Sequence, residues 1–122
     1  MTVTALSLMA EELKLAPNER AIILTMLRLS PVSIRAEETL IPVKDLVAAL
    51  PVGVKSFHAL KDVVEELMKT KRTESAKGDR YSFSLLMFFE WVDDSKFLRF
   101  QLNLQFCSML KQLALVRKVS PF

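Results

Sequence analysis

The sequence is poor in the residues from which most catalytic and cofactor sites are built. Its 122 residues include one cysteine, one histidine and two glycines. The lone Cys107 excludes an intrachain disulfide and a thiolate metal cluster, and it fits a protein of the reducing cytoplasm. Gly53 and Gly78 are too far apart to form a glycine-rich phosphate loop, which argues against nucleotide-binding enzymes of the P-loop and Rossmann classes.

The residues for acid–base catalysis are also missing. His58 has no second histidine or cysteine near it in sequence, so we interpret it as a surface or half-buried helix residue and not as a metal ligand. Carboxylates that are adjacent on a helix point in different directions, and this applies to Glu11/Glu12, Glu37/Glu38, Glu65/Glu66 and Asp93/Asp94. We therefore predict no enzyme activity, no cofactor and no bound metal.

Long apolar runs are absent as well. No uninterrupted apolar segment approaches the length of a membrane span, and the N-terminal run MTVTALSLMAEELKL has no basic segment, unlike a signal peptide. Hydrophobic residues make up 51% of the chain and charged residues 25%, which is typical of a compact fold. The sequence thus predicts one cytoplasmic domain over residues 1–122, with no membrane partner and no small-molecule substrate.

Helical periodicity is present over most of the chain. Apolar residues repeat at helical spacing in five segments, which predicts helices at 3–15, 17–29, 43–50, 54–69 and 104–115. In the last of them the repeat consists of Phe106, Met109, Leu110, Leu113 and Val116. A short strand is predicted at 39–41 and a loop at 32–38, and residues 70–80 are predicted as a loop or a mobile connection between strands.

Residues 81–104 carry the clearest strand pattern. The odd positions from Tyr81 to Trp91 are all apolar, and after the polar cluster 93–96 the alternation restarts from Leu98 to Leu104. We predict a β-hairpin of two long strands with one face in the core. The second face is made unusually apolar by Leu86, Phe88, Val92 and Phe97. That face needs a cover, either from the helices of the same chain or from a second copy.

The order of the predicted elements is that of a winged helix. A short strand, two helices joined by a tight turn and a β-hairpin form a helix-turn-helix with a sheet appended. The predicted fold class is therefore α+β and mostly helical, with the hairpin as the wing. Other small α+β folds share this pattern and stay open.

Positive charge is concentrated in the second part of the chain. Residues 1–50 hold five basic and six acidic side chains, whereas residues 51–122 hold twelve and eight. A basic cluster attracts phosphates, so we predict contacts with double-stranded DNA from Lys55, Lys61, Lys69, Lys71, Arg72, Lys77 and Arg80. The helix at 54–69 also carries Asp62, Glu65 and Glu66, which favours backbone contact or a solvated face over base reading in the major groove.

Four segments resemble the N-terminal winged-helix domain of Rep-type plasmid replication initiators. They are LAPNERAIILTML (15–27), LIPVKDLVAAL (40–50), SFHALKDVVEELMKTK (56–71) and FFEWVDDSKFLRFQLNLQFCSMLKQL (88–113), within a run of about four fifths of the chain. In that family a second winged-helix domain follows and makes the main base contacts with repeated origin sites called iterons. The first domain dimerises and adds contacts, largely to the DNA backbone.

The resemblance implies a dimerising, DNA-contacting domain of a chain that continues beyond Phe122. The predicted homodimer interface consists of Leu86, Phe88, Val92 and Phe97. Two alternatives stay open at this point. One is a protein-interaction or dimerisation domain that never touches DNA, and the other is a free-standing winged-helix transcription regulator.

Overall fold

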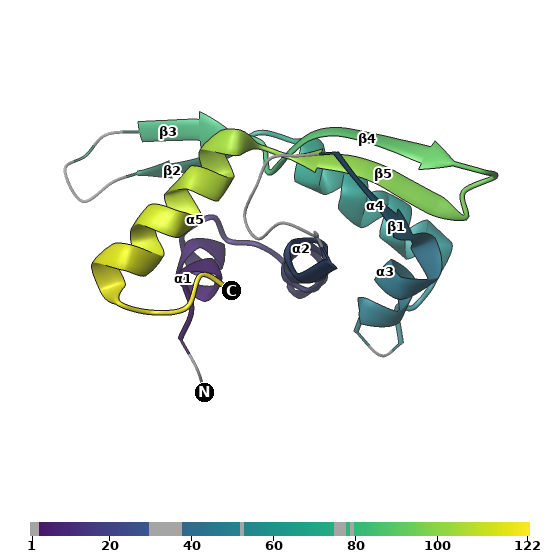
Figure 1. Cartoon of the computed structure of the whole chain (residues 1–122), viewed down its shortest axis with the longest axis horizontal. Coiled ribbons are helices and arrows are strands. Elements are labelled where there is room, and N and C mark those ends of the chain that lie inside the picture. Colours follow the sequence, from purple (N-terminus) through teal and green to yellow (C-terminus); the bar gives the residue numbers. More distant parts are fainter. Residues whose placement is uncertain (1–2, 30–37, 52, 75–77, 79) are drawn as a thin grey trace.

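The described part of the chain is an α+β structure in which helices take the larger share. The computed structural model describes residues 3–29, 38–51, 53–74, 78 and 80–122 (Figure 1). The helices are α1 (Ala5–Glu12), α2 (Pro17–Leu29), α3 (Val43–Ala49), α4 (Phe57–Met68) and α5 (Leu104–Arg117), and the strands are β1 (Glu38–Pro42), β2 (Lys71–Glu74), β3 (Arg80–Phe83), β4 (Leu86–Val92) and β5 (Phe97–Leu102). The α+β class and the five predicted helices are confirmed. The predicted loop at 32–38 lies outside the described residues except for Glu38.

Three strands form an antiparallel sheet with the order β1-β5-β4, so the strand that comes last in sequence lies in the centre. One row across this sheet consists of Ile41, Leu98 and Trp91. Their side chains face the helices, because Ile41 and Leu98 are buried in the core and Trp91 packs against it. The helices lie on one side of this sheet in Figure 1. The strand predicted at 39–41 is confirmed, because these residues belong to β1 and pair with β5.

The first strand of the predicted hairpin is in fact two strands that belong to two different sheets. β3 pairs with β2, and only β4 pairs with β5. Between β3 and β4 the Ser84 hydroxyl donates a hydrogen bond to the Leu86 carbonyl (3.0 Å), and the Leu85 carbonyl accepts one from the Asn103 amide (2.9 Å). Defined hydrogen bonds thus hold the chain where it passes from one sheet to the other.

A β-bulge also shifts the side-chain alternation in β4. The register slips between Leu86 and Phe88, so Leu85 and Leu86 are both buried whereas Met87 is 57% exposed. The prediction that Met87 faces the core is wrong. Alternation presumes an unbroken ladder, and at the bulge Leu86 turns into the core while Met87 turns out. Beyond the bulge, Phe89 and Trp91 pack against the core as the alternation predicts.

The polar segment predicted as a loop or mobile connection at 70–80 contains β2. Its sequence, KRTE, has no apolar alternation, but it forms an antiparallel ladder with β3 in which Lys71 lies opposite Phe83 and Arg72 opposite Ser82. Phe83 is buried and its ring stacks on that of Phe106 in α5, with the ring centroids 6.4 Å apart. The β2–β3 pair is therefore anchored to the core through one face.

Capping side chains set two of the helix starts. The Ser56 hydroxyl accepts a hydrogen bond from the Ala59 amide (3.0 Å), so α4 begins at Phe57, three residues later than predicted. The Asn103 side chain accepts one from the Gln105 amide (2.7 Å), and α5 begins at Leu104, the predicted first residue of this helix. At the other end of α5, Val116 is 73% exposed, so its predicted inward position is wrong.

The first and last described segments lie together. The amides of Ala5 and Leu6, at the start of α1, donate to the carbonyls of Ser120 and Pro121, each at 2.9 Å. α1 also packs along α5, and both helices contribute to a single buried cluster with α2, α3, α4 and the sheet. The most completely buried large side chains of this cluster include Phe100, Phe106, Met26, Leu46 and Leu60.

Candidate functional site

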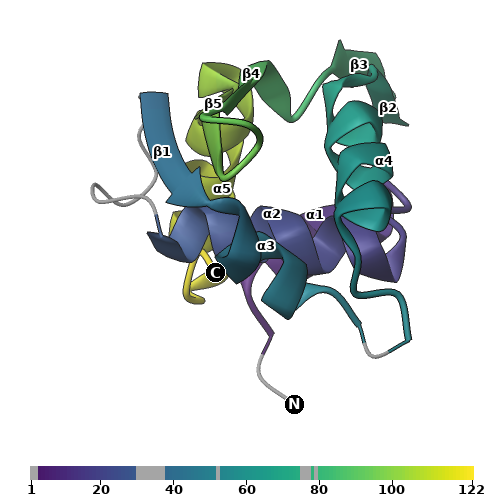
Figure 2. The same ribbon diagram turned by 90° about the vertical axis from the view of Figure 1, so that its right-hand side faces the viewer.

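The predicted DNA-contacting cations fall into two groups at opposite ends of α4. Lys55 precedes the helix and Lys61 lies in its second turn, whereas Lys69, Lys71, Arg72 and Arg80 lie beyond its C-terminal end. The 12 residues of α4 span about 18 Å at 1.5 Å per residue, and Lys61 and Lys69, the nearest members of the two groups, are about 12 Å apart along it. Figure 2 shows the β2–β3 pair above one end of α4. Lys77 lies outside the described residues.

Lys71 is part of a buried ion pair. Its ammonium lies 2.8 Å from the Glu19 carboxylate, and the two side chains are only 16% and 11% exposed. The other carboxylate oxygen of Glu19 accepts the Ala16 amide at the start of α2 (3.0 Å). Lys71 therefore neutralises a buried carboxylate and joins β2 to α2, and we leave it out of the DNA contact that is proposed below.

Lys69 is also paired with a glutamate. Its ammonium is 2.6 Å from a carboxylate oxygen of Glu66 on the last turn of α4. This hydrogen bond lowers the pKa of Glu66 and raises that of Lys69, with the attraction of opposite charges adding to both shifts. The pair is exposed, so Lys69 is accessible to solvent, but its charge is largely offset.

The two lysines at the other end of α4 have contacts of their own. The Lys55 ammonium donates to the Ala48 carbonyl of α3 (2.9 Å), and the Lys61 ammonium lies 5.8 Å from the centre of the Phe57 ring. Asp62 and Glu65 are exposed between them and the β2–β3 pair, and Asp62 lies 3.8 Å from the His58 ring. The exposed side of α4 is thus mixed in charge.

Arg72 and Arg80 are the exposed cations on the outer face of the β2–β3 pair. Lys71 and Phe83 occupy the face that turns to the core, and side chains alternate along a strand, so Arg72 and Arg80 project from the opposite face. Arg72 lies opposite Ser82, two positions from Arg80, which makes the two arginines diagonal neighbours across the ladder. Glu74 lies opposite Arg80 in the same ladder, and the two arginines are the exposed cations that the β2–β3 pair contributes to the predicted set.

The predicted dimer residues do not share one surface. Leu86 is completely buried in the core and has no surface to offer a partner, so the prediction that it belongs to the interface is wrong. Phe88, Val92 and Phe97 are half-buried and lie on the outer face of the three-stranded sheet, opposite the helices. Leu40 shares this face and is 52% exposed.

Charged side chains cross the middle of this outer face. The Arg99 guanidinium lies 3.2 Å from Glu90 and 3.9 Å from Glu38, one on each neighbouring strand. The outer face is consequently apolar at one end, where Pro42, Phe97 and Val92 lie in one row, and elsewhere Leu40 and Phe88 alternate with polar side chains. No described helix covers it in Figure 1.

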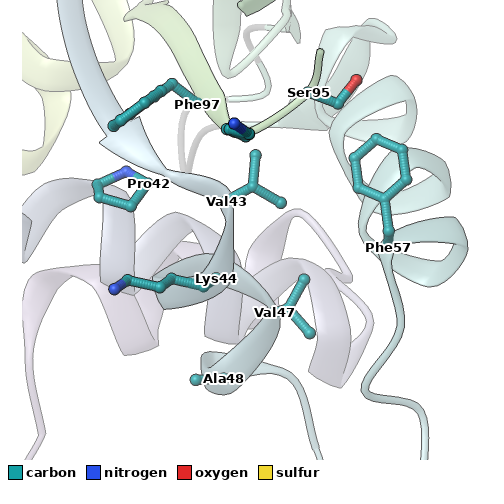
Figure 3. Close-up of a pocket in the computed structure, with 9 residues that line it drawn as sticks. Pro42, Val43, Lys44, Val47, Ala48, Phe57, Ser95 and Phe97 are labelled. Atoms are coloured by element: carbon teal, nitrogen blue, oxygen red, sulfur yellow. The ribbon is translucent and has the colours of Figure 1, made fainter. Parts of the chain in front are cut away.

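A groove that sequence reasoning missed lies between α3, the first residue of α4 and the β4–β5 turn. It encloses about 740 Å³ and is lined by Pro42, Val43, Lys44, Val47, Ala48, Phe57, Ser95, Lys96 and Phe97 (Figure 3). Val43 and Val47, one turn apart on α3, face the Phe57 ring across it. The lining comes from three segments that are distant in sequence, so no local motif marks the groove.

Other candidate residues of the sequence have structural roles. Cys107 is buried, and burial raises the pKa of its thiol, so it acts as a small apolar side chain of the core. Among the described residues no three His, Cys, Asp or Glu side chains are grouped so that they could hold a metal ion. None of the helices in that part of the chain has the length and apolar character needed to cross a lipid bilayer.

Comparison with protein-family models, with curated proteins and with solved structures finds no match to this chain.

Proposed function

We propose that the chain is a DNA-binding module of the winged-helix type that contacts the phosphate backbone. The observation that carries the proposal is the path α2-β1-α3-α4-β4-β5 together with the sheet order β1-β5-β4. A helix, a short strand, two helices and a hairpin whose last strand pairs with the first is the winged-helix order. In this proposal α3 and α4 are the helix-turn-helix, β4–β5 is the wing, and β2–β3 is an insertion between them.

The distribution of charge favours backbone contact over base reading. α4 exposes Asp62 and Glu65, and the β4–β5 turn exposes Asp93 and Asp94, where carboxylates would be repelled by phosphates. Arg72 and Arg80 project from one face with the fork geometry that suits phosphate oxygens. We therefore assign the DNA contact to the outer face of the β2–β3 pair.

The same proposal includes the role of N-terminal domain in a plasmid replication initiator. Its support is that the four segments resembling that family coincide with α2, with β1 and α3, with α4 up to β2, and with β4 to α5. These are the elements of the winged-helix path. In such a protein this domain would add contacts with the phosphate backbone, while base reading falls to a second domain.

Binding to duplex DNA is expected to be weak and independent of sequence. At physiological salt the isolated chain should bind a 25-base-pair duplex with a Kd of about 10⁻⁴–10⁻⁶ M, equally for iteron-like and scrambled sequences. Arg72→Gln with Arg80→Gln should weaken binding about tenfold, which corresponds to about 1.4 kcal/mol. Fluorescence anisotropy of labelled duplexes measures both. The absence of binding even at low salt would remove the DNA role and favour a protein-interaction domain.

A second candidate function, pairing of two copies, is favoured by the outer face of the three-stranded sheet. Leu40 is 52% exposed on the β1 edge of that face, half-buried Val92 and Phe97 lie in the neighbouring row, and half-buried Phe88 lies toward the other end of β4. Exposed apolar groups gathered on one face are typical of an interaction surface, and a two-fold axis would place the same face on both partners. We propose this surface, without Leu86, as the homodimer interface.

The dimer makes a prediction for solution mass. Light scattering of the wild-type chain is expected to show a mass that rises with concentration toward twice the monomer value. The double variant Leu40→Lys with Phe88→Lys is expected to keep the monomer mass at every concentration, because like charges would face each other across the axis. Leu115→Lys, on the exposed side of α5, is the matched control and should dimerise like the wild type. A monomer mass for the wild type at every concentration would contradict the interface.

A further inference from the structure

The groove between α3, α4 and the β4–β5 turn is held in shape by contacts on every side. The Val43 amide, at the start of α3, donates to the Lys96 carbonyl of the turn (2.9 Å). The Lys55 ammonium closes the other end of α3 by donating to the Ala48 carbonyl (2.9 Å). Phe57 meets Trp91 of β4 edge to face, with ring centroids 5.1 Å apart. The three walls are thus fixed relative to one another.

The lining is apolar with a basic rim. Proline, valine, alanine and phenylalanine side chains make up most of the lining, and the charged side chains among its residues are the lysines Lys44 and Lys96. Lys55 adjoins it through its bond to Ala48, and Lys61 lies over the Phe57 ring. The exposed carboxylates on the same elements are not part of the lining, and they are Asp45, Asp62, Glu65, Asp93 and Asp94.

The apolar lining and the basic rim together indicate which kind of molecule can occupy the groove. A DNA strand would bring phosphates against an apolar floor, which offers them no hydrogen-bond donors. A second copy of the chain would have to insert an exposed apolar side chain. Leu115 and Val116 are the most exposed ones, but they lie on α5 beside Lys111, Arg117 and Lys118, which the lysine rim would repel.

We propose that the groove binds a short amphipathic segment of another protein, in which two or more apolar side chains are flanked by aspartates or glutamates. The apolar side chains fill the space between Val43, Val47 and Phe57. The carboxylates pair with Lys44 and Lys96. This is recognition of a peptide by an apolar groove with charge-selected ends, and it does not depend on DNA binding by Arg72 and Arg80.

Trp91 reports on the groove directly. It is the single tryptophan of the chain and touches Phe57, a groove residue. The probe is a 12-residue peptide with leucines one helical turn apart and glutamates between them. The control peptide has the same sequence with lysines in place of the glutamates. The acidic peptide should change Trp91 emission saturably, and the lysine peptide should bind at least about tenfold more weakly because of the lysine rim.

Two variants complete the experiment. Ala48→Glu places a carboxylate at an exposed groove position of a helix without disturbing the core, and Lys44→Glu with Lys96→Glu reverses the rim; each should weaken the acidic peptide at least about tenfold. Arg72→Gln with Arg80→Gln should leave peptide binding unchanged.

Equal binding of both peptides, or no effect of Ala48→Glu, overturns the proposal. So does a groove variant that converts a dimer to a monomer, or that abolishes DNA binding, since either outcome identifies a different occupant.

Discussion

Lys71→Met is expected to lower the free energy of unfolding by about 3 kcal/mol, although the lysine lies in a polar strand near the surface. The substitution removes the partner of Glu19, whose carboxylate is 2.8 Å from the Lys71 ammonium and whose side chain is only 11% exposed. The buried carboxylate would then lose this counter-charge while it still accepts the Ala16 amide. Urea unfolding followed by Trp91 fluorescence measures the loss.

Two further variants separate the ion pair from other effects. Arg72→Met, one residue along the same strand and exposed, should change stability by no more than about 0.5 kcal/mol. Adding Glu19→Gln to Lys71→Met should recover part of the loss, because glutamine keeps an acceptor for Ala16 and carries no charge. A fully stable Lys71→Met protein with weakened DNA binding would return Lys71 to the DNA-contacting set.

Phe106→Ala is expected to cost about 3–5 kcal/mol. The Phe106 ring is completely buried and stacks on Phe83, so its loss leaves a cavity where α5, the β2–β3 pair and the core meet. Leu115→Ala on the same helix is the control, since Leu115 is 79% exposed and its removal should change stability by about 0.5 kcal/mol or less. Thermal and urea unfolding of both variants measure the difference. Similar stabilities for the two would contradict the role of Phe106 in joining these elements.

Helix positions follow from the sequence because their signals are local. Pro17, Asn103 and the apolar periods act within a few residues, and the helices begin and end close to the predicted positions. The predicted start of α4 is three residues too early, and this error also has a local cause. The apolar period is the only signal behind that prediction, whereas the Ser56 side chain caps the helix and sets its first residue. The inward position predicted for Val116 is wrong because a period cannot tell where the helix leaves the core.

Strand pairing could be predicted only in part because partners are chosen at long range. The alternation from Tyr81 to Trp91 identifies extended chain, but not that β3 pairs with β2 while β4 pairs with β5. The bulge that exposes Met87 leaves no mark in residue type.

The candidate site could be predicted least well, for a related reason. A cluster of basic residues in sequence cannot reveal that Lys71 meets Glu19, 52 positions away. The pair of Glu66 and Lys69 is different, because an i,i+3 spacing on a helix is a local signal that could have been used. Arg72 and Arg80 stay in the predicted set because their strands turn them outward. The groove needs α3, α4 and the β4–β5 turn to be assembled before it exists, so sequence patterns do not contain it.

The salt dependence of duplex binding tests the central proposal, phosphate contact by Arg72 and Arg80, most directly. For the wild-type chain the logarithm of the binding constant should fall linearly with the logarithm of salt concentration. Arg72→Gln with Arg80→Gln should make that slope shallower by about 1.8, or about 0.9 for each phosphate that an arginine no longer neutralises. Lys44→Gln with Lys96→Gln, which removes the same charge from the groove, should leave the slope unchanged. Identical slopes for the wild type and the arginine variant would contradict the proposal.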